Sequence, residues 1–108
     1  MKLVLAIVQD ADSDDLIDEI TKEGYRVTKV ISTGGFLKSG NSTIMIGTDD
    51  SEVDRLIELI SHNCKVREII KSIQPMNMPG TSIATLPIKV KVGGATVFVL
   101  DVVDFKRF

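Results

Sequence analysis

Apolar residues in the first third of the chain follow the pattern of two strands joined by a helix. Residues 2–8 are a continuous aliphatic run, which is typical of a strand buried on both faces. Residues 13–23 place apolar side chains at helical spacing, and Asp12 or Ser13 can cap this helix. Residues 25–32 alternate and are rich in β-branched side chains, which favours a strand. The segment is therefore predicted to form a βαβ unit.

The middle of the chain continues with a strand and a helix after a glycine-rich loop at residues 33–41. Residues 42–48 predict the third strand. From Ser51 to about residue 63, apolar positions at i, i+3, i+4 and i+7 predict the second helix. Residues 64–85 include VREIIKSI at 66–73, which fits a strand or a helical turn, and continue with two prolines. We expect a long mobile loop there.

The last part of the chain predicts a β-hairpin. Residues 88–92 alternate, Gly93 and Gly94 suit a two-residue turn, and residues 95–103 are rich in β-formers. Together the elements predict one α+β domain over residues 1–108. Its order, β-α-β-β-α-β with an extra hairpin arm, is that of the ferredoxin-like fold.

A sheet of this kind has one face left over after two helices cover the other. The strands are predicted to be apolar on both faces, as judged from Val4, Ala6, Val8, Ile44, Ile46, Val97 and Val99. We therefore expect another copy of the chain to cover the second face.

Composition narrows the class of protein. The chain has 108 residues, 44% of them hydrophobic, which is enough for one domain with its own core. A net charge of -2 gives no overall attraction to nucleic acid or to an anionic membrane. The apolar run at residues 3–8 is too short for a signal peptide or a membrane span, and a single cysteine cannot form an intramolecular disulfide. We expect a cytoplasmic protein without membrane insertion.

The side chains that could support catalysis are few. His62 is the only histidine and is predicted near the end of the second helix, where the helix dipole favours a cation. Cys64 lies close to Lys65 and Arg67, which could lower its thiol pKa, but an inert core cysteine is the simpler interpretation.

Four acidic residues in succession could also suggest a metal site, although a helix N-terminus explains them more simply. They are Asp10, Asp12, Asp14 and Asp15. We therefore expect neither an enzyme nor a metal or cofactor.

The glycine-rich loop has the strongest potential for binding. Residues 35–42 differ by one residue from the phosphate loop of nucleotide hydrolases, but Asn41 replaces the required lysine and a strand follows. Its glycines still allow backbone N–H groups to approach a phosphate. The amide of Asn41 can bond the N6/N7 edge of adenine, and Phe36 could stack on a base. Alternatively, the loop is only a mobile connection with Phe36 in the core.

Three segments resemble one known family. They are KLVLAIVQDADS near the N-terminus, RVTKVISTGGFLKSGNSTIMIG at residues 26–47 and VKVGGATVFVLDVVDF at residues 90–105. The sequence is similar to the PII-like cyclic di-AMP receptors over almost its whole length. Ordinary PII proteins share the fold but carry a longer loop with a modifiable tyrosine, which this chain lacks.

The resemblance implies a non-enzymatic signalling protein that forms a homotrimer. One cyclic di-AMP would bind in each cleft between neighbouring subunits, and the response would be a change of loop conformation recognised by an unknown protein partner. The family's long flexible loop would correspond to residues 66–89. The alternative is an ordinary PII sensor of ATP/ADP and 2-oxoglutarate, which the short loop disfavours.

The resemblance also assigns ligand contacts. Arg26 and Thr28 would contact phosphate and ribose, Gly35 would supply a backbone donor, Phe36 and Leu37 would form apolar walls, Asn41 would contact adenine, Gly47 would allow close approach of the second base, and Phe98, Val99 and Leu100 would come from the last strand.

Overall fold

The computed structural model describes residues 1–30, 40–73 and 86–108. In chain order, its elements are β1 (Lys2–Gln9), α1 (Asp10–Lys22), β2 (Val27–Val30), β3 (Asn41–Thr48), η1 (Asp50–Glu52), α2 (Val53–Asn63), β4 (Arg67–Ile73), β5 (Leu86–Val92) and β6 (Ala95–Asp101).

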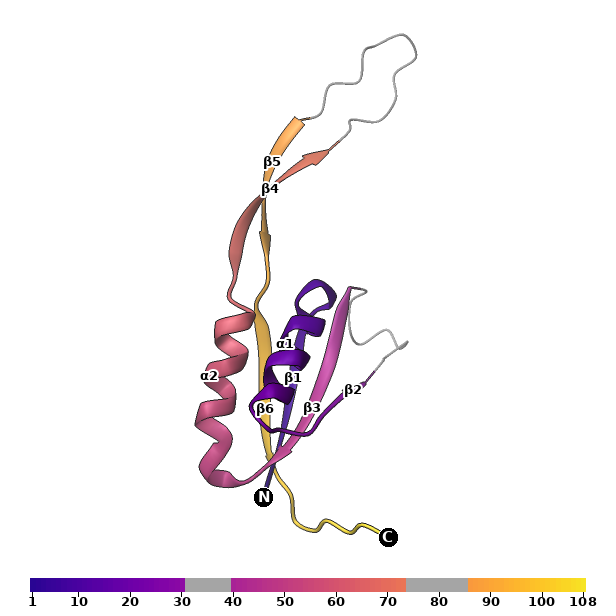
Figure 1. Cartoon of the computed structure of the whole chain (residues 1–108). Helices are drawn as coiled ribbons and strands as arrows, with labels where there is room; N and C mark the ends of the chain where they lie inside the picture. The colour runs from indigo at the N-terminus through magenta and orange to yellow at the C-terminus, as the bar shows by residue number, and fades with distance from the viewer. Residues whose placement is uncertain (31–39, 74–85) are drawn as a thin grey trace.

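Four strands form the main sheet, in the order β2-β3-β1-β6, and every neighbouring pair is antiparallel. Both helices lie on one face of this sheet (Figure 1). With β4 and β5 inserted between α2 and β6, the order is the predicted β-α-β-β-α-β. The ferredoxin-like prediction is confirmed.

The core lies between this sheet face and the helices. Strand side chains alternate between the two faces, so every second residue of β1 and β3 points towards α1 and α2. The fully buried apolar side chains are Val4, Ala6, Val8, Leu16, Ile20, Ile44, Ile46, Leu56 and Ile60, with Cys64 beside them.

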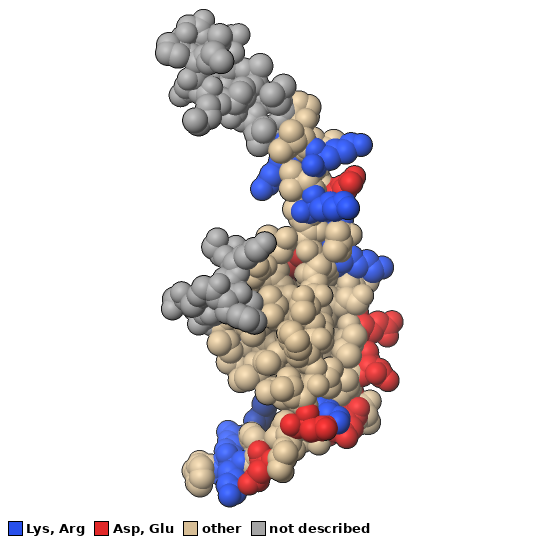
Figure 2. Space-filling view, turned by 180° about the vertical axis from the view of Figure 1, so that it is seen from behind, with Lys and Arg blue, Asp and Glu red and all other residues tan. Residues whose placement is uncertain are grey.

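The opposite sheet face is apolar and uncovered. We call it the open face, and it carries Leu3, Leu5, Ile7, Met45, Phe98 and Leu100. Figure 2 shows a broad surface here without charged side chains. The seven residues from which an apolar second face was predicted all lie on the helix-covered face instead. The sheet does have a second apolar face, but residues other than the predicted ones form it.

Helix α1 begins three residues before its predicted start. Neither Asp12 nor Ser13 caps it, because both are buried in its first turn. The Ser13 hydroxyl donates to the carbonyl oxygen of Asp10 at 2.8 Å. The polar side chains of this turn therefore serve contacts within the fold rather than a cap.

The segment after α2 was predicted as a long mobile loop whose start, VREIIKSI, could also be a strand; the strand alternative is confirmed for residues 67–73, and the loop is wrong there. These residues form β4, which pairs with β5 in a separate two-stranded sheet. We call this pair the ribbon. It projects from the domain (Figure 1). Residues 74–85 lie outside the described residues.

The predicted hairpin between β5 and β6 is also wrong. Strand β5 pairs with β4, and β6 pairs with β1, so the two glycines between them join two different sheets. Gly93 donates its N–H to Oε1 of Gln9 at 2.7 Å, and Gly94 donates to the carbonyl of Cys64. Both glycines have positive φ. A two-residue hairpin turn requires this backbone conformation, and so does the connection between the two sheets here. The extra hairpin arm is the ribbon.

Candidate ligand-binding site

Two of the expected ligand contacts meet in a cavity beside β2. Arg26 and Gly47 line this edge pocket of about 400 Å³, together with Tyr25, Thr48 and Asp49. Gly47 pairs with Leu3 in the sheet, and a Cβ atom on it would lie 3.3 Å from Cε of Met1. The pocket therefore combines an exposed guanidinium with a backbone that a ligand can approach closely.

The other charged groups of the edge pocket are largely paired. The Tyr25 hydroxyl donates to Oε2 of Glu52 at 2.8 Å, and burial followed by this carboxylate raises the pKa of Tyr25. Arg55 forms ion pairs with Glu23 and Glu52. No ion pair joins Arg26 to another described residue, so its guanidinium remains the available cation for a phosphate.

Asn41 lies at the other end of β3, opposite Gln9 of β1. The preceding Gly40 has a φ of +93°, and its carbonyl accepts the backbone N–H of Asp10 at 2.8 Å. The following Ser42 donates its hydroxyl to the Asp10 carboxylate. Hydrogen bonds of the residues on both sides therefore fix the position of Asn41. It lies about 20 Å along the strand from Gly47.

The expected contacts from β6 divide between the two faces. Phe98 and Leu100 lie on the open face, with side chains 52% and 43% exposed. Val99 pairs with the buried Val4 and lies on the helix-covered face. Adjacent strand residues point in opposite directions, so Val99 cannot share one surface with Phe98 and Leu100.

Thr28 lies on the open face of β2, three strand spacings or about 14 Å from Phe98. Within one chain, Thr28 therefore lies on one edge strand and Phe98 on the other, with Asn41 and Gly47 on β3 between them. Gly35, Phe36 and Leu37 lie outside the described residues.

A match to a known family covers the whole chain. The profile of the cyclic-di-AMP receptor family matches residues 1–108. The chain belongs to the cyclic-di-AMP receptor family. The receptor is also similar to the crystal structure of a functionally unknown protein from Pediococcus pentosaceus ATCC 25745, at 45% identity. That match covers 99% of this chain and 96% of the other, with a TM-score of 0.77.

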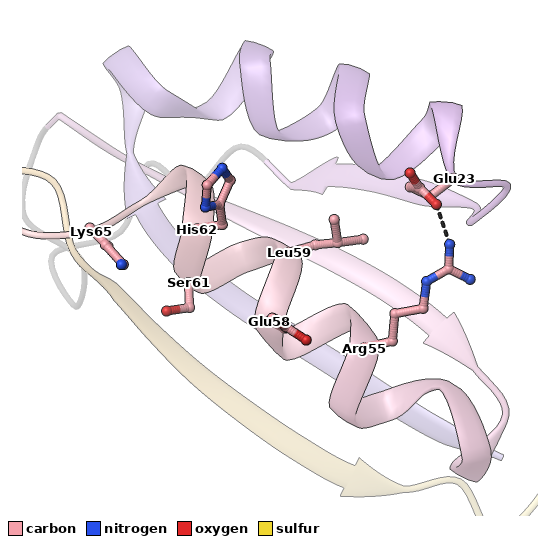
Figure 3. Close-up of a pocket in the computed structure, with 7 residues that line it drawn as sticks. All are labelled: Glu23, Arg55, Glu58, Leu59, Ser61, His62 and Lys65. Carbon is pink, nitrogen blue, oxygen red and sulfur yellow. Dashed lines mark hydrogen bonds and ion pairs between the residues drawn. The ribbon is translucent and has the colours of Figure 1, made fainter.

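A second cavity of the receptor, about 520 Å³ in volume, lies along α2 and contains none of the expected contacts. Figure 3 shows Arg55 directed to Glu23 across its end, with His62 and Lys65 at the other. Acidic and basic groups are mixed here, as they are in the edge pocket, so charge alone does not distinguish the two cavities.

Cys64 of the receptor is buried at 1% exposure. Burial, followed by the charge of Asp12, raises its thiol pKa to about 11, and Arg67 opposes this shift only in part. The prediction that Cys64 is a core residue is confirmed. Within the described ranges, no group of three or more His, Cys, Asp or Glu side chains could hold a metal ion, and no helix is long and apolar enough to cross a membrane.

Sequence reasoning missed the contact between Arg67 and Asp12. Arg67 donates from Nη2 to Oδ1 of Asp12 at 2.7 Å, joining the root of the ribbon to the turn beside Asn41. The two residues are 55 positions apart, and neither belongs to a motif that would signal the pair.

Proposed function

We propose that this receptor binds cyclic di-AMP between neighbouring subunits of a homotrimer and transmits binding to a protein partner through its loops. The supporting observation is the separation of the expected contacts. Arg26, Thr28 and Gly47 lie at the β2 side, whereas Phe98 and Leu100 lie on β6. One subunit cannot surround a ligand with both groups, but two subunits joined edge to edge can.

The uncovered open face supports the trimer. Full burial of a leucine or phenylalanine side chain stabilises by about 1.5–3 kcal/mol, and much of this gain is still unrealised at Phe98 and Leu100. A closed ring of copies would bury the open face of each one.

In this site, Arg26 and Thr28 would contact phosphate and ribose, and Asn41 would recognise adenine. Gly35, Phe36 and Leu37 would complete the walls, and Gly47 would admit the second base. Val99 lies on the helix-covered face of β6, so it would support Phe98 and Leu100 without contacting a ligand on the open face. The protein would act in the cytoplasm as a non-enzymatic receptor without a cofactor.

Calorimetry on the purified full chain with cyclic di-AMP, cyclic di-GMP and ATP tests this proposal. We expect saturable binding of cyclic di-AMP with one ligand per subunit and weaker binding of the other two. Preferential binding of ATP would instead support an ordinary PII sensor, and absence of cyclic di-AMP binding would reject the proposal.

A further inference from the structure

The ribbon is the basic part of an otherwise acidic chain. Residues 65–92 contain five of the thirteen basic residues and one of the fifteen acidic residues, which gives this segment a net charge of +4. Because the whole chain carries -2, the remainder carries -6. Figure 2 shows Lys and Arg side chains gathered along the ribbon, beyond the body of the domain. Such separation of charge favours an anionic partner at the ribbon.

The two outer edges of the ribbon differ. Within the described residues, β4 and β5 pair only with each other. The β5 edge contains Pro87, which lacks an N–H and cannot donate a main-chain hydrogen bond to another strand, and this discourages further pairing. Strand β4 has no proline, and its Ile70 side chain is 70% exposed. The β4 edge is therefore the one suited to accept another strand.

Addition of a strand would also stabilise the ribbon. An isolated two-stranded sheet is only marginally stable in water, whereas a third strand supplies new main-chain hydrogen bonds. The ribbon is anchored at its root by Arg67 but contacts the domain little beyond it. The stability of its outer part therefore depends on whether a further strand pairs with it.

The side chains of β4 define what a third strand must carry. Arg67, Ile69 and Lys71 share one face, and Glu68 and Ile70 the other. Arg67 is already held by Asp12, whereas Lys71 is exposed and forms no ion pair with a described residue. A complementary strand places an acidic side chain opposite Lys71 and apolar side chains opposite both isoleucines.

A second copy of β4 fits this edge poorly. Antiparallel pairing that sets Ile69 against the same residue of another copy also sets Arg67 against Lys71, and directly opposed like charges destabilise a sheet. Nucleic acid is disfavoured by Glu68 within the ribbon and by the acidic remainder of the chain. The observations favour an acidic segment of another protein.

We propose that the outer edge of β4 binds an extended acidic segment of a partner protein as a third strand, with an acidic side chain paired to Lys71 and apolar side chains against Ile69 and Ile70. This deepens the proposed function by assigning a class of downstream partner, but the edge is present without cyclic di-AMP.

A fluorescent peptide tests the proposal with the full chain in the absence of nucleotide. The probe contains Asp-Val-Val-Thr flanked by threonines, so that antiparallel pairing sets its aspartate against Lys71. We expect saturable binding by anisotropy, and about tenfold weaker binding when lysine replaces that aspartate. Lys71→Glu should cause the same loss and should bind the lysine peptide better than the aspartate peptide. Lys22→Glu, an equal charge change on α1, should leave binding unchanged.

Amide hydrogen exchange locates the bound peptide. Slower exchange should appear along β4 and not along the outer edge of β5. No saturable binding up to about 1 mM, equal losses for Lys71→Glu and Lys22→Glu, or absence of protection on β4 would overturn the proposal. Tighter binding of the full chain to duplex DNA or to anionic vesicles than to the peptide would also overturn the proposal.

Calorimetry with cyclic di-AMP on the same samples separates the two proposals. Nucleotide binding without peptide binding rejects only the β4 edge. Peptide binding without nucleotide binding rejects only the receptor function.

Discussion

Arg67 at the start of β4 holds the buried carboxylate of Asp12 with both terminal nitrogens of its guanidinium, at 2.7 Å from Nη2 to Oδ1 and 3.4 Å from Nη1 to Oδ2. Asp12 is only 7% exposed, and Arg67 is the cation that pairs with its carboxylate. The contact also fixes the root of the ribbon against α1. One ion pair thus contributes to both the stability of the domain and the orientation of the ribbon.

Arg67→Ala should destabilise the protein because it leaves the Asp12 carboxylate buried without its cation. We expect the free energy of unfolding to fall by about 1.5–3 kcal/mol, the range for a hydrogen bond to a charged group. Arg67→Lys keeps the charge but loses the paired donors and should lie between. Urea unfolding of the three proteins provides the measurement, and an unchanged midpoint for Arg67→Ala would contradict the interpretation.

Gly93→Ala should be more harmful than Gly24→Ala, although both glycines have nearly the same positive φ. A Cβ atom on Gly93 would overlap the carbonyl oxygen of Lys65, whereas one on Gly24 meets no atom within 4 Å. We expect Gly24→Ala to lose about 1–2 kcal/mol from backbone strain alone and Gly93→Ala to lose more. Equal losses in chemical denaturation would show that the crossing of the two sheets tolerates a side chain.

Cys64 should make stability fall in alkaline solution. Its thiol pKa is raised to about 11 in the folded protein, mainly by burial, so the native state binds this proton more tightly than the unfolded chain does. The contribution is present below the ordinary thiol pKa and is lost as pH rises towards 11. Unfolding measured from neutral to alkaline pH should show a steeper decline for the wild type than for Cys64→Ala. Parallel curves would argue against a buried neutral thiol.

Leu100→Glu and Val99→Glu form a matched pair that tests the open face. The two side chains are neighbours on β6 and equally exposed, at 43%, but they lie on opposite faces of the sheet. A charge at Leu100 should dissociate the proposed trimer because the open face would then carry an unpaired carboxylate into the interface. Val99→Glu should retain it. Light scattering of both variants decides this, and a trimeric Leu100→Glu protein would exclude the open face from the interface.

Asn41→Ala should weaken cyclic di-AMP binding by about 1–3 kcal/mol and reduce the preference over cyclic di-GMP. Adenine presents an N6 amine where guanine presents O6, and an amide side chain held in a fixed orientation can distinguish the two. Calorimetry with both dinucleotides measures the change. If the variant kept the full preference, adenine recognition would have to come from another residue.

Local sequence patterns were enough to predict the main sheet and the helices. Burial between the sheet and the helices leaves a direct signature in the sequence. It accounts for the alternation at Ile44 and Ile46 and for the apolar positions Val4 and Ala6 in the first run. Arg26 and Gly47 were singled out by resemblance, and they do share a pocket. These features depend on neighbours in the sequence or on motifs.

The wrong predictions of the hairpin and of the start of α1 depend on long-range pairing. Gly93 and Gly94 satisfy the backbone requirements of a hairpin, but whether β5 pairs with β6 or with β4 is decided by β4, twenty or more residues earlier in the chain. The first turn of α1 was misplaced for the same reason, because the polar residue Asp12 is stabilised there by Arg67. No local signal distinguishes an aspartate that caps a helix from one that pairs with an arginine far away in the sequence.

The carbonyl of Cys64 accepts the N–H of Gly94 at the root of the ribbon. The residues between these two positions therefore form an insertion whose two ends lie side by side. Among the described residues, the insertion adds no strand to the main sheet, whose register is set by β1, β2, β3 and β6. An insertion closed in this way can change in length or in charge while the register of the main sheet stays the same.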